Sequence, residues 1–422
     1  MRRMYLDYAS TTPLDPRVKK VMEPYLTNQF GNPSSIHAEG VIAKKALDIA
    51  RTTVARCLEA HAEEIVFTSG GTEANNLAIL GVISSAASSA PLQRGSAEAA
   101  RRRGVEDSTP LNPPSKEGGR KIVPHVVTTN IEHSSVLEPL RELERQGKVE
   151  MTYVPVEPNG IVKAEKIISA IKPNTILVSV MYANNEIGTI QPIRKIGQAI
   201  QNLKISKPQN FKILFHSDAC QAPLYLRCFV NALGVDLLTL DGHKIYGPKG
   251  IGALYVRRNT PLAPQLLGGG QERGLRSTTE NIPAVVGFAE ALRIATSERE
   301  KESARIKKIR DNLYSQILKN VRIDVVVNGS MAEGERLPSN LNISFPGVDT
   351  EFLTLKLDAL GVAVSTKSSC LRDKKSSYVI SALGGGTKRA VSSLRFTPGR
   401  GTTKKDIEYA TKALTKLVSE KH

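Results

Sequence analysis

Short apolar runs alternate with helix-like segments over residues 65–256. Ile65–Thr68 forms the first run, and it is followed by HVVTT, EMTYVPV, TILVSVMYAN, KILFHSDA, VDLLTL and GALYV. Segments with apolar residues at helical spacing, such as VLEPLRELERQ and IRKIGQAIQNL, lie between several of these runs. Strands and helices that alternate at this spacing indicate βαβ units and a largely parallel sheet covered on both faces. The pattern therefore predicts an α/β domain.

The alternation is interrupted at residues 84–121. This segment is rich in Ser, Ala, Pro, Gly and Arg and contains almost no large apolar residue. Such a composition buries too little apolar surface to offset the entropy that ordering costs. We therefore predict a flexible surface insertion, with a functional docking loop as the alternative.

The pattern changes again from about Thr296. A long, charge-rich helix is expected over SEREKESARIKKIRDNLYSQILKN, followed by short runs such as RIDVVV, NLNISF and LRFTP and by a last helix over KKDIEYATKALTKLVSE. This mixture predicts a smaller α+β domain. We expect residues 1–15 and 296–422 to form this small domain, which carries Cys370 and Arg395, and residues 16–295 to form the large domain.

Composition narrows the class of protein. The chain has 422 residues, of which 40% are hydrophobic and 23% are charged, as in an ordinary folded protein. No stretch approaches the roughly 20 apolar residues of a membrane span, and the first residues lack the apolar core of a secretory signal. The four cysteines include no CxxC pair, which argues against a disulfide scaffold or a closed zinc site. We expect a cytoplasmic protein with no bound metal and no membrane association.

The net charge of +17 raises the question of nucleic-acid binding. About half of it lies between Val364 and Lys405, where ten basic residues accompany a single acid, Asp373. Few aromatic residues are interleaved with these bases, which disfavours direct nucleic-acid binding. Two interpretations remain, a solvated surface or a basic collar around Cys370.

Ser69-Gly70-Gly71-Thr72-Glu73 follows a strand and opens a helix. Glycines let backbone N–H groups converge on an anion, and the helix N-terminus adds partial positive charge. The segment predicts a phosphate cradle, or else only a tight strand-to-helix turn. It matches neither the P-loop nor the GxGxxG pattern.

A carboxylate and a lysine follow two successive strands. Asp218 ends KILFHSDA, and Lys244 follows VDLLTL in a Gly- and Pro-rich turn. The carboxyl ends of parallel strands share one edge of the sheet, where such sheets bind ligands. A surface ion pair is one interpretation. The cradle upstream favours another, in which Lys244 forms an imine with pyridoxal phosphate (PLP) and Asp218 keeps the pyridine nitrogen protonated.

Three further residues are candidates for the site. His133 also follows a strand and is suited to stacking on a planar cofactor and to proton transfer. Cys370 has polar and basic neighbours, which favour an exposed thiolate, whereas Cys57, Cys220 and Cys228 lack this setting. Arg395 is either a solvent-facing side chain or a bidentate clamp for a carboxylate.

With these motifs in place, the chain resembles the cysteine desulfurases of the PLP-dependent class V aminotransferase superfamily. The resemblance rests on YLDYASTTPLDPRV, FGNPSSIHAEG, EIVFTSGGTEANNLAI, EHSSVLEP, ANNEIGTIQPI, HSDACQA, DGHKIYGPKGIGALYVRR, GGGQERGLRSTTENI, the Cys370 loop and LRFTPGR. They run in family order over nearly the whole chain except the insertion. The resemblance implies fold type I, with a mostly parallel seven-stranded sheet in the large domain and a smaller C-terminal α+β domain.

The resemblance also implies a role for each site residue. Lys244 matches the PLP-binding lysine, Asp218 the acid at the pyridine nitrogen, Gln221 the residue that bonds the ring hydroxyl, and His133 the ring-stacking histidine. Gly71, Thr72 and His243 match phosphate ligands, and Thr279 matches a threonine that reaches the phosphate from the neighbouring subunit, which implies a homodimer with shared sites. Asn185 and Arg395 match binders of the substrate carboxylate, and Cys370 matches the nucleophile that receives sulfur as a persulfide.

Two departures from the family stand out. Asp241 replaces a small phosphate-binding residue three positions before Lys244, and a carboxylate there repels a phosphate unless it turns away or His243 neutralises it. The loop around Cys370 carries bulky and basic residues in place of mostly small ones.

The resulting prediction is a cysteine desulfurase that converts L-cysteine to L-alanine and leaves a persulfide on Cys370. The sulfur then passes to an acceptor protein, such as an iron–sulfur scaffold, or to tRNA thiolation. Selenocysteine lyase and aminotransferase activities of the same fold are alternatives, but a transaminase needs no catalytic thiol. A basic RNA-binding protein without catalysis is a further alternative, which the joint presence of Lys244, Asp218, His133 and Cys370 disfavours.

Overall fold

The computed structural model describes residues 3–89, 123–206, 213–366 and 376–419. Its main feature is a seven-stranded sheet in the order β2-β8-β7-β6-β5-β3-β4. The strands are β2 (Ile65–Thr68), β3 (His125–Thr129), β4 (Glu150–Val154), β5 (Thr175–Ser179), β6 (Leu214–Asp218), β7 (Leu237–Asp241) and β8 (Gly252–Val256). Of these, β8 runs antiparallel to both of its neighbours and the others are mutually parallel. The predicted mostly parallel sheet is confirmed.

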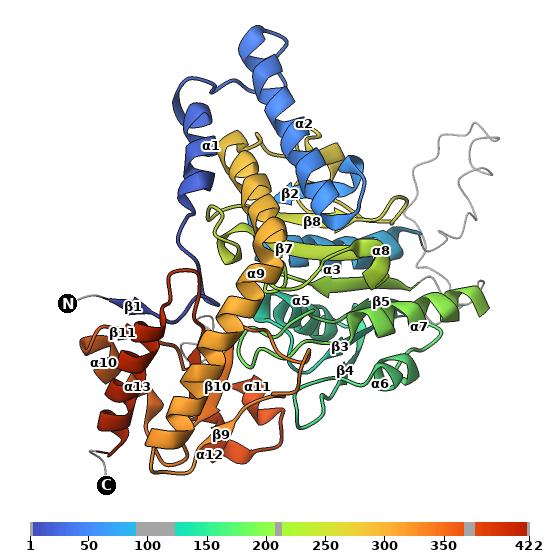
Figure 1. The fold of residues 1–422 in the computed structure, drawn as a ribbon. Coiled ribbons are helices and arrows are strands. Elements are labelled where there is room, and N and C mark those ends of the chain that lie inside the picture. The colour runs from blue at the N-terminus through green and yellow to red at the C-terminus, as the bar shows by residue number, and fades with distance from the viewer. Residues whose placement is uncertain (1–2, 90–122, 207–212, 367–375, 420–422) are drawn as a thin grey trace, which may run out of the picture.

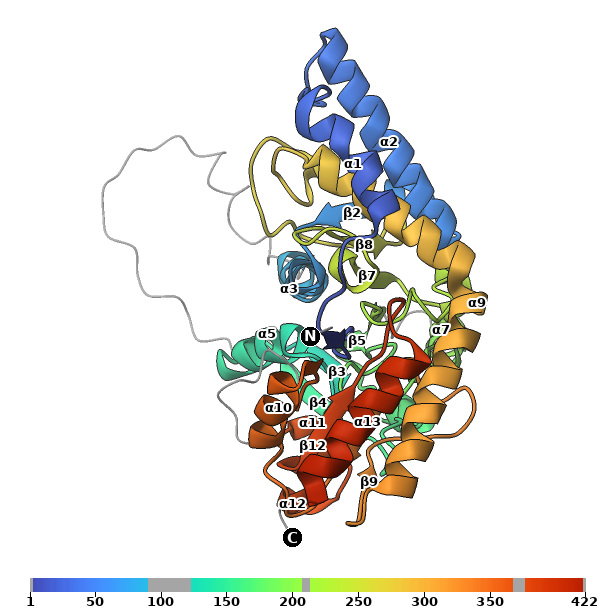
Figure 2. The same cartoon turned by 60° about the vertical axis from the view of Figure 1, so that its left-hand side comes forward.

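Helices cover both faces of this sheet (Figures 1 and 2). Val66 and Val126 belong to a core with α3 (Gly71–Ser89) and α5 (Ser134–Arg145) on one face. Phe67 and Val127, the next residues along their strands, belong to a core on the other face. That core includes α2 (Ala38–Leu58), α6 (Ala164–Ser169), α7 (Ile193–Ser206), α8 (Val230–Leu233) and the first half of α9 (Ile282–Asn320). This alternation is what two apolar faces require of a strand.

A separate core lies at the C-terminal end of the chain. It is built on an antiparallel sheet of β9 (Val326–Val327), β10 (Leu341–Ser344) and β12 (Ser393–Phe396), with α10 (Thr350–Ala359) and α13 (Lys404–Ser419). The N-terminal strand β1 (Met4–Tyr5) pairs with β11 (Val362–Ala363), so Met4 and Leu6 join this core. By contrast, α11 (Tyr378–Ser381) and α12 (Gly386–Ala390) pack on the core of the large sheet.

Helix α9 joins the two cores (Figure 1). It begins at Ile282, well before the expected start near Thr296, and packs on α1 (Pro16–Thr27) and α2 at one end and on α13 at the other. The expected domain boundary at residue 296 therefore falls inside a continuous helix. Residues 84–89 of the predicted insertion continue α3, and its residues 90–121 lie outside the described residues.

Candidate active site

One cavity of about 280 Å³ lies at the carboxyl edge of the parallel strands. Its lining includes nine of the residues that the sequence nominated: Gly71, Thr72, His133, Asn185, Asp218, Gln221, His243, Lys244 and Arg395. Two nominated residues are not among them. Thr279 lines a different cavity, together with Glu272 and Arg276, and Cys370 lies outside the described residues.

Lys244 ends a short 3-10 turn (Gly242–Lys244) directly after β7. Its Nζ donates to the carbonyl oxygens of Ala9 at 2.8 Å and Ser10 at 2.7 Å. Gln221 Nε2 donates to the same Ala9 carbonyl at 3.0 Å. The N-terminal segment thus forms one wall of the cavity and holds the amine in place.

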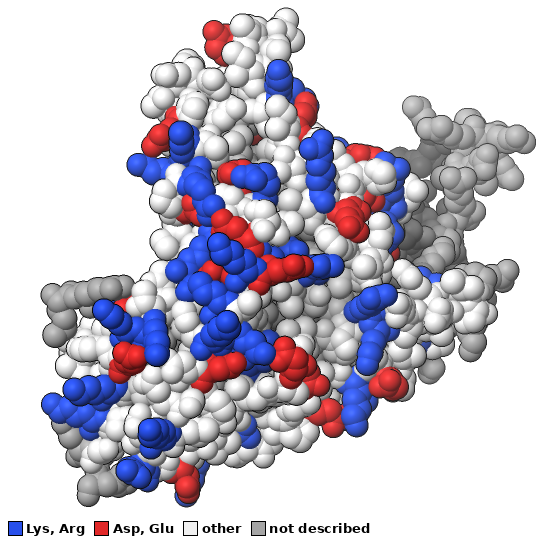
Figure 3. Space-filling model, in the orientation of Figure 1, with Lys and Arg blue, Asp and Glu red and all other residues white. Residues whose placement is uncertain are grey.

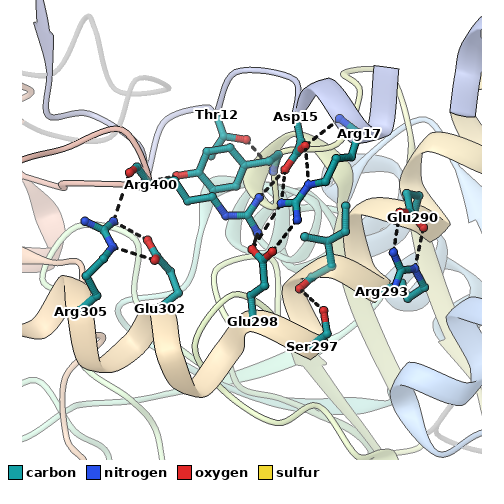
Figure 4. A network of polar contacts seen from close by, with 12 residues as sticks. Thr12, Asp15, Arg17, Glu290, Arg293, Ser297, Glu298, Glu302, Arg305 and Arg400 are labelled. Atoms are coloured by element: carbon teal, nitrogen blue, oxygen red, sulfur yellow. Dashed lines mark hydrogen bonds and ion pairs between the residues drawn. The ribbon is translucent and has the colours of Figure 1, made fainter. Parts of the chain in front are cut away.

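A polar network near this lysine turn joins the N-terminal segment to α9 and to Arg400 (Figure 4). Asp15 accepts from Arg17 and from Arg400, whose Nη1 lies 2.7 Å from Asp15 Oδ2. Glu298 of α9 faces the same two guanidinium groups. The Arg400 guanidinium lies 4.4 Å from the centre of the Tyr246 ring, two residues after Lys244. The contact of Arg400 with the Tyr246 ring and the carboxylates shared by Arg17 and Arg400 both favour a fixed position of the turn that carries Lys244.

Asp218 and His133 are connected through Asn75, which the sequence analysis did not single out. Asn75 Nδ2 donates to Asp218 Oδ2 and to Ser135 Oγ, both at 2.8 Å. Ser135 in turn contacts His133 Nδ1, which also accepts the Ser135 backbone N–H at 3.1 Å. Because Nδ1 is an acceptor, the neutral ring carries its proton on Nε2. Asn75 lies four residues after Gly71 on α3, so the Asn75 amide and the Gly71 N–H lie on one face of this helix.

Arg395 is almost fully buried, with 1% of its surface exposed. Its Nη2 donates to Asp7 Oδ1 at 2.5 Å and to Ser10 Oγ at 2.7 Å, and its Nη1 donates to the Asn185 carbonyl at 2.9 Å. Its Nε has no hydrogen-bond partner among the described residues. The interpretation as a solvent-facing side chain is wrong, because the side chain is buried. Its guanidinium lies at the cavity wall and still has N–H groups able to donate.

Cys220 also lines the cavity but is a poor nucleophile. Burial, followed by the negative charges of Asp218 and Asp241, raises the pKa of its thiol well above the ordinary value. The thiol therefore stays protonated near neutral pH, and the thiolate is the reactive form. This agrees with the expectation that Cys220 lacks the setting that favours a reactive thiolate.

The cavity suits PLP at its ring end. Asp218 Oδ1 accepts the Cys220 N–H at 2.9 Å and Oδ2 accepts from Asn75, and a carboxylate has further lone pairs that can accept a pyridinium N–H. The Lys244 amine is at hand for an imine. At the phosphate end, Gly71, Thr72 and His243 lie together as expected. Asp241, however, does not turn away from them, since its Oδ2 accepts the Gly71 N–H at 2.7 Å.

The described residues contain no cluster of side chains able to hold a metal ion. Nor does any helix within the described ranges have the length and apolar character that crossing a membrane requires. On the face of the molecule in Figure 3, acidic side chains lie among the basic ones over the middle of the molecule. Of the ten bases between residues 364 and 405, the buried Arg395 forms an ion pair with Asp7 and the half-buried Arg400 forms one with Asp15.

Comparison with known proteins agrees with this geometry. Residues 4–90 and 118–409 match the family described as Aminotransferase class-V, which leaves most of the predicted insertion unmatched. The chain is 40% identical to the cysteine desulfurase IscS of Dictyoglomus turgidum over 99% of this chain and 95% of that protein. A solved structure named NifS-like protein covers 99% of this chain and 100% of its own, with a TM-score of 0.83 and 31% identity. A second structure, SspA in complex with cysteine, has a TM-score of 0.73 and 30% identity, and the match covers 95% of this chain and 100% of that one.

Proposed function

The chain belongs to the class V aminotransferase family and is a cysteine desulfurase, and from this premise we propose how its own residues carry out the reaction. Lys244 binds PLP, and the sulfur of L-cysteine passes to Cys370. The observation that carries the proposal is the joint lining of one cavity by Lys244, Asp218, His133 and Arg395.

Residues at both ends of the cavity would hold the cofactor. Lys244 would form the covalent link, Asp218 would bind the pyridine nitrogen, Gln221 the ring hydroxyl and His133 the ring face, while Gly71, Thr72 and His243 would bind the phosphate. When bound, PLP supplies an electron sink for negative charge that develops at the substrate Cα.

The remaining steps belong to the side chains. Arg395 and Asn185 bind the carboxylate of L-cysteine, and Lys244 Nζ removes the Cα proton. The Cys370 thiolate attacks the substrate sulfur, so that an S–S bond forms while the Cβ–S bond breaks and its electron pair stays on the carbon skeleton. His133 and Lys244 supply the protons that complete L-alanine. The balance is one L-cysteine and one enzyme thiol to one L-alanine and one enzyme persulfide.

The flanks of residues 367–375 support Cys370 as the acceptor. Before that segment, the Ser365 carbonyl accepts the Arg395 N–H at 2.6 Å. After it, Ser377 Oγ donates to Glu186 Oε2 at 2.6 Å, and the Tyr378 hydroxyl donates to the carbonyl of Glu132, the neighbour of His133. The chain thus enters and leaves the Cys370 segment beside cavity residues.

We further propose a homodimer in which Thr279 completes the phosphate site of the partner. Within one chain, Thr279 does not line the Lys244 cavity. Large apolar side chains near it in sequence and in the loop between α1 and α2 are exposed, with Leu267 at 84%, Phe30 at 75% and Ile36 at 98%. Exposed apolar surface of this kind is typical of a protein interface. The persulfide then passes to an acceptor protein such as an iron–sulfur scaffold.

Borohydride reduction tests the cofactor site. Purified protein should absorb in the visible range after addition of PLP, and reduction followed by peptide mapping should place the cofactor on Lys244. With L-cysteine, the loaded protein should release alanine. Attachment to another lysine, or a protein that cannot take up PLP, would refute the proposal.

A further inference from the structure

The predicted phosphate cradle is occupied by a carboxylate of the chain itself. Asp241, the last residue of β7, accepts the N–H of Gly71, the first residue of α3, at 2.7 Å through Oδ2. Its Oδ1 accepts the His243 N–H at 3.1 Å and lies 3.4 Å from His243 Nε2. Asp241 is 8% exposed. Burial alone would raise its pKa, but hydrogen bonds and positive charge from His243, the Gly71 N–H and Lys244 outweigh burial and lower it. The carboxylate is therefore ionised at neutral pH.

The bond from Gly71 uses a helix N-terminal donor that a phosphate at this turn would use. The N-terminal N–H groups of a helix and its partial positive charge are what attract a phosphate to such a turn. Two anions that share these donors repel each other. Gly71 packs closely against Cys220, because a Cβ on Gly71 would lie 2.6 Å from Cys220 Sγ.

We propose that Asp241 determines cofactor affinity by competing with the phosphate of PLP for the N-terminus of α3. The inference rests on the proposed PLP site. Its consequence is that the chain gains cofactor affinity mainly from Lys244, Asp218 and the ring contacts, and little from the phosphate. It therefore distinguishes only weakly between PLP and pyridoxal, which lacks the phosphate.

Equilibrium dialysis of the cofactor-free, full-length protein against PLP and against pyridoxal tests this directly. The ratio of the two dissociation constants measures what the phosphate contributes. For the wild type we expect PLP to bind less than about tenfold more tightly than pyridoxal, which is less than about 1.4 kcal/mol. Asp241→Asn keeps the size and removes the charge, and Asp241→Ser also shortens the side chain. In both variants the ratio should rise about tenfold or more, with pyridoxal affinity unchanged.

Asp236→Asn is the matched control. Asp236 lies just before the other end of β7 and pairs with Lys204 at 3.0 Å, so its loss removes one negative charge far from the cradle. The ratio should stay at the wild-type value. Retained pyridoxal binding shows that each variant is folded at the site.

The outcomes are distinct. A wild type that binds PLP orders of magnitude more tightly than pyridoxal overturns the inference. So does a ratio of the two dissociation constants that is unchanged or lower in the two Asp241 variants. Neither result contradicts the proposed PLP site. If the wild type binds neither PLP nor pyridoxal, the proposed cofactor site fails, and the inference fails with it.

Discussion

Arg395 is the residue at which binding and stability can be separated by experiment. It is buried, it donates to Asp7, Ser10 and the Asn185 carbonyl, and it faces the proposed carboxylate site. Arg395→Met keeps a side chain of similar length and removes every donor. We expect this variant to lose both cysteine affinity and folding stability, for reasons that differ.

The loss of stability follows from the Asp7 carboxylate, which Arg395→Met leaves without its ion-pair partner. The Asp7 side chain is 17% exposed and its carboxylate loses the ion pair with Arg395 Nη2. Removal of one partner from a buried pair costs about 3–5 kcal/mol, and the partial exposure of Asp7 places this variant near 3 kcal/mol. Asp7→Asn in the same chain removes the stranded charge, so the double variant should regain part of that loss.

The catalytic loss should not be regained. A hydrogen bond to a charged group contributes about 1.5–3 kcal/mol, which corresponds to about a 10- to 150-fold fall in kcat/KM for L-cysteine. The Asp7→Asn change does not restore a donor for the substrate carboxylate, so kcat/KM should stay low. Urea denaturation measures the stability, and alanine formation measures the activity of PLP-loaded protein.

Arg336→Met serves as the control. Arg336 is also buried, at 5% exposed, and donates to the Ser330 carbonyl and to Asn340 Oδ1, away from the cavity. It should lower stability and leave kcat/KM unchanged. If Arg395→Met lowers stability and leaves kcat/KM at the wild-type value, Arg395 has only a structural role and the assignment is wrong.

Three further predictions concern other parts of the chain. Cys370→Ser should abolish the persulfide that mass spectrometry detects after reaction with L-cysteine, whereas Cys220→Ser should keep it, because the raised pKa of the Cys220 thiol keeps it protonated; a persulfide on Cys220 would reverse the assignment. Replacing residues 91–117, which the family does not match, with a short Gly/Ser linker should leave the melting temperature and PLP uptake unchanged, and insoluble protein would contradict this. Burial raises the pKa of Glu132 to about 8 from 4.5. Between these values the folded state keeps a proton that the unfolded state loses, so the free energy of unfolding of the wild type should fall as pH rises from about 4.5 to 8. Glu132→Gln should flatten that slope in urea titrations, and parallel slopes for the two proteins would show that Glu132 ionises normally.

Strands could be predicted well because their signal is local. Residues 65–68, 125–129 and 252–256 are strands with the expected bounds, since each is a short apolar run between turn residues. The start of α9 could not be predicted in the same way. Between Ile282 and Ala295 this helix is buried on most sides, so its residues show no polar face and no helical period. The period appears only after Thr296, where one face meets solvent.

The site residues also divide into those with a local signal in the sequence and those without one. Those at the ends of parallel strands, such as Asp218 and Lys244, could be predicted because the topology brings strand ends to one edge. Asn75, Asp7 and Ser10 could not, because their contacts cross long stretches of sequence. Asn75 lies 143 positions from Asp218, and Asp7 lies 388 positions from Arg395. Nothing local in the sequence marks either contact.

The two aspartates at this edge show how far sequence alone can go. Asp218 and Asp241 end the neighbouring strands β6 and β7, and each accepts the N–H of the residue two positions later, from Cys220 and His243. Locally they are the same turn. Helix α3 makes them different, because it presents an amide, Asn75, to one and its N-terminal Gly71 N–H, one helical turn earlier, to the other. Under the proposed function, Asp218 keeps lone pairs for a ring nitrogen, while Asp241 takes a donor that a phosphate would use. In the proposed site, this one helix therefore leaves Asp218 able to bind the cofactor ring and places Asp241 in competition with the cofactor phosphate.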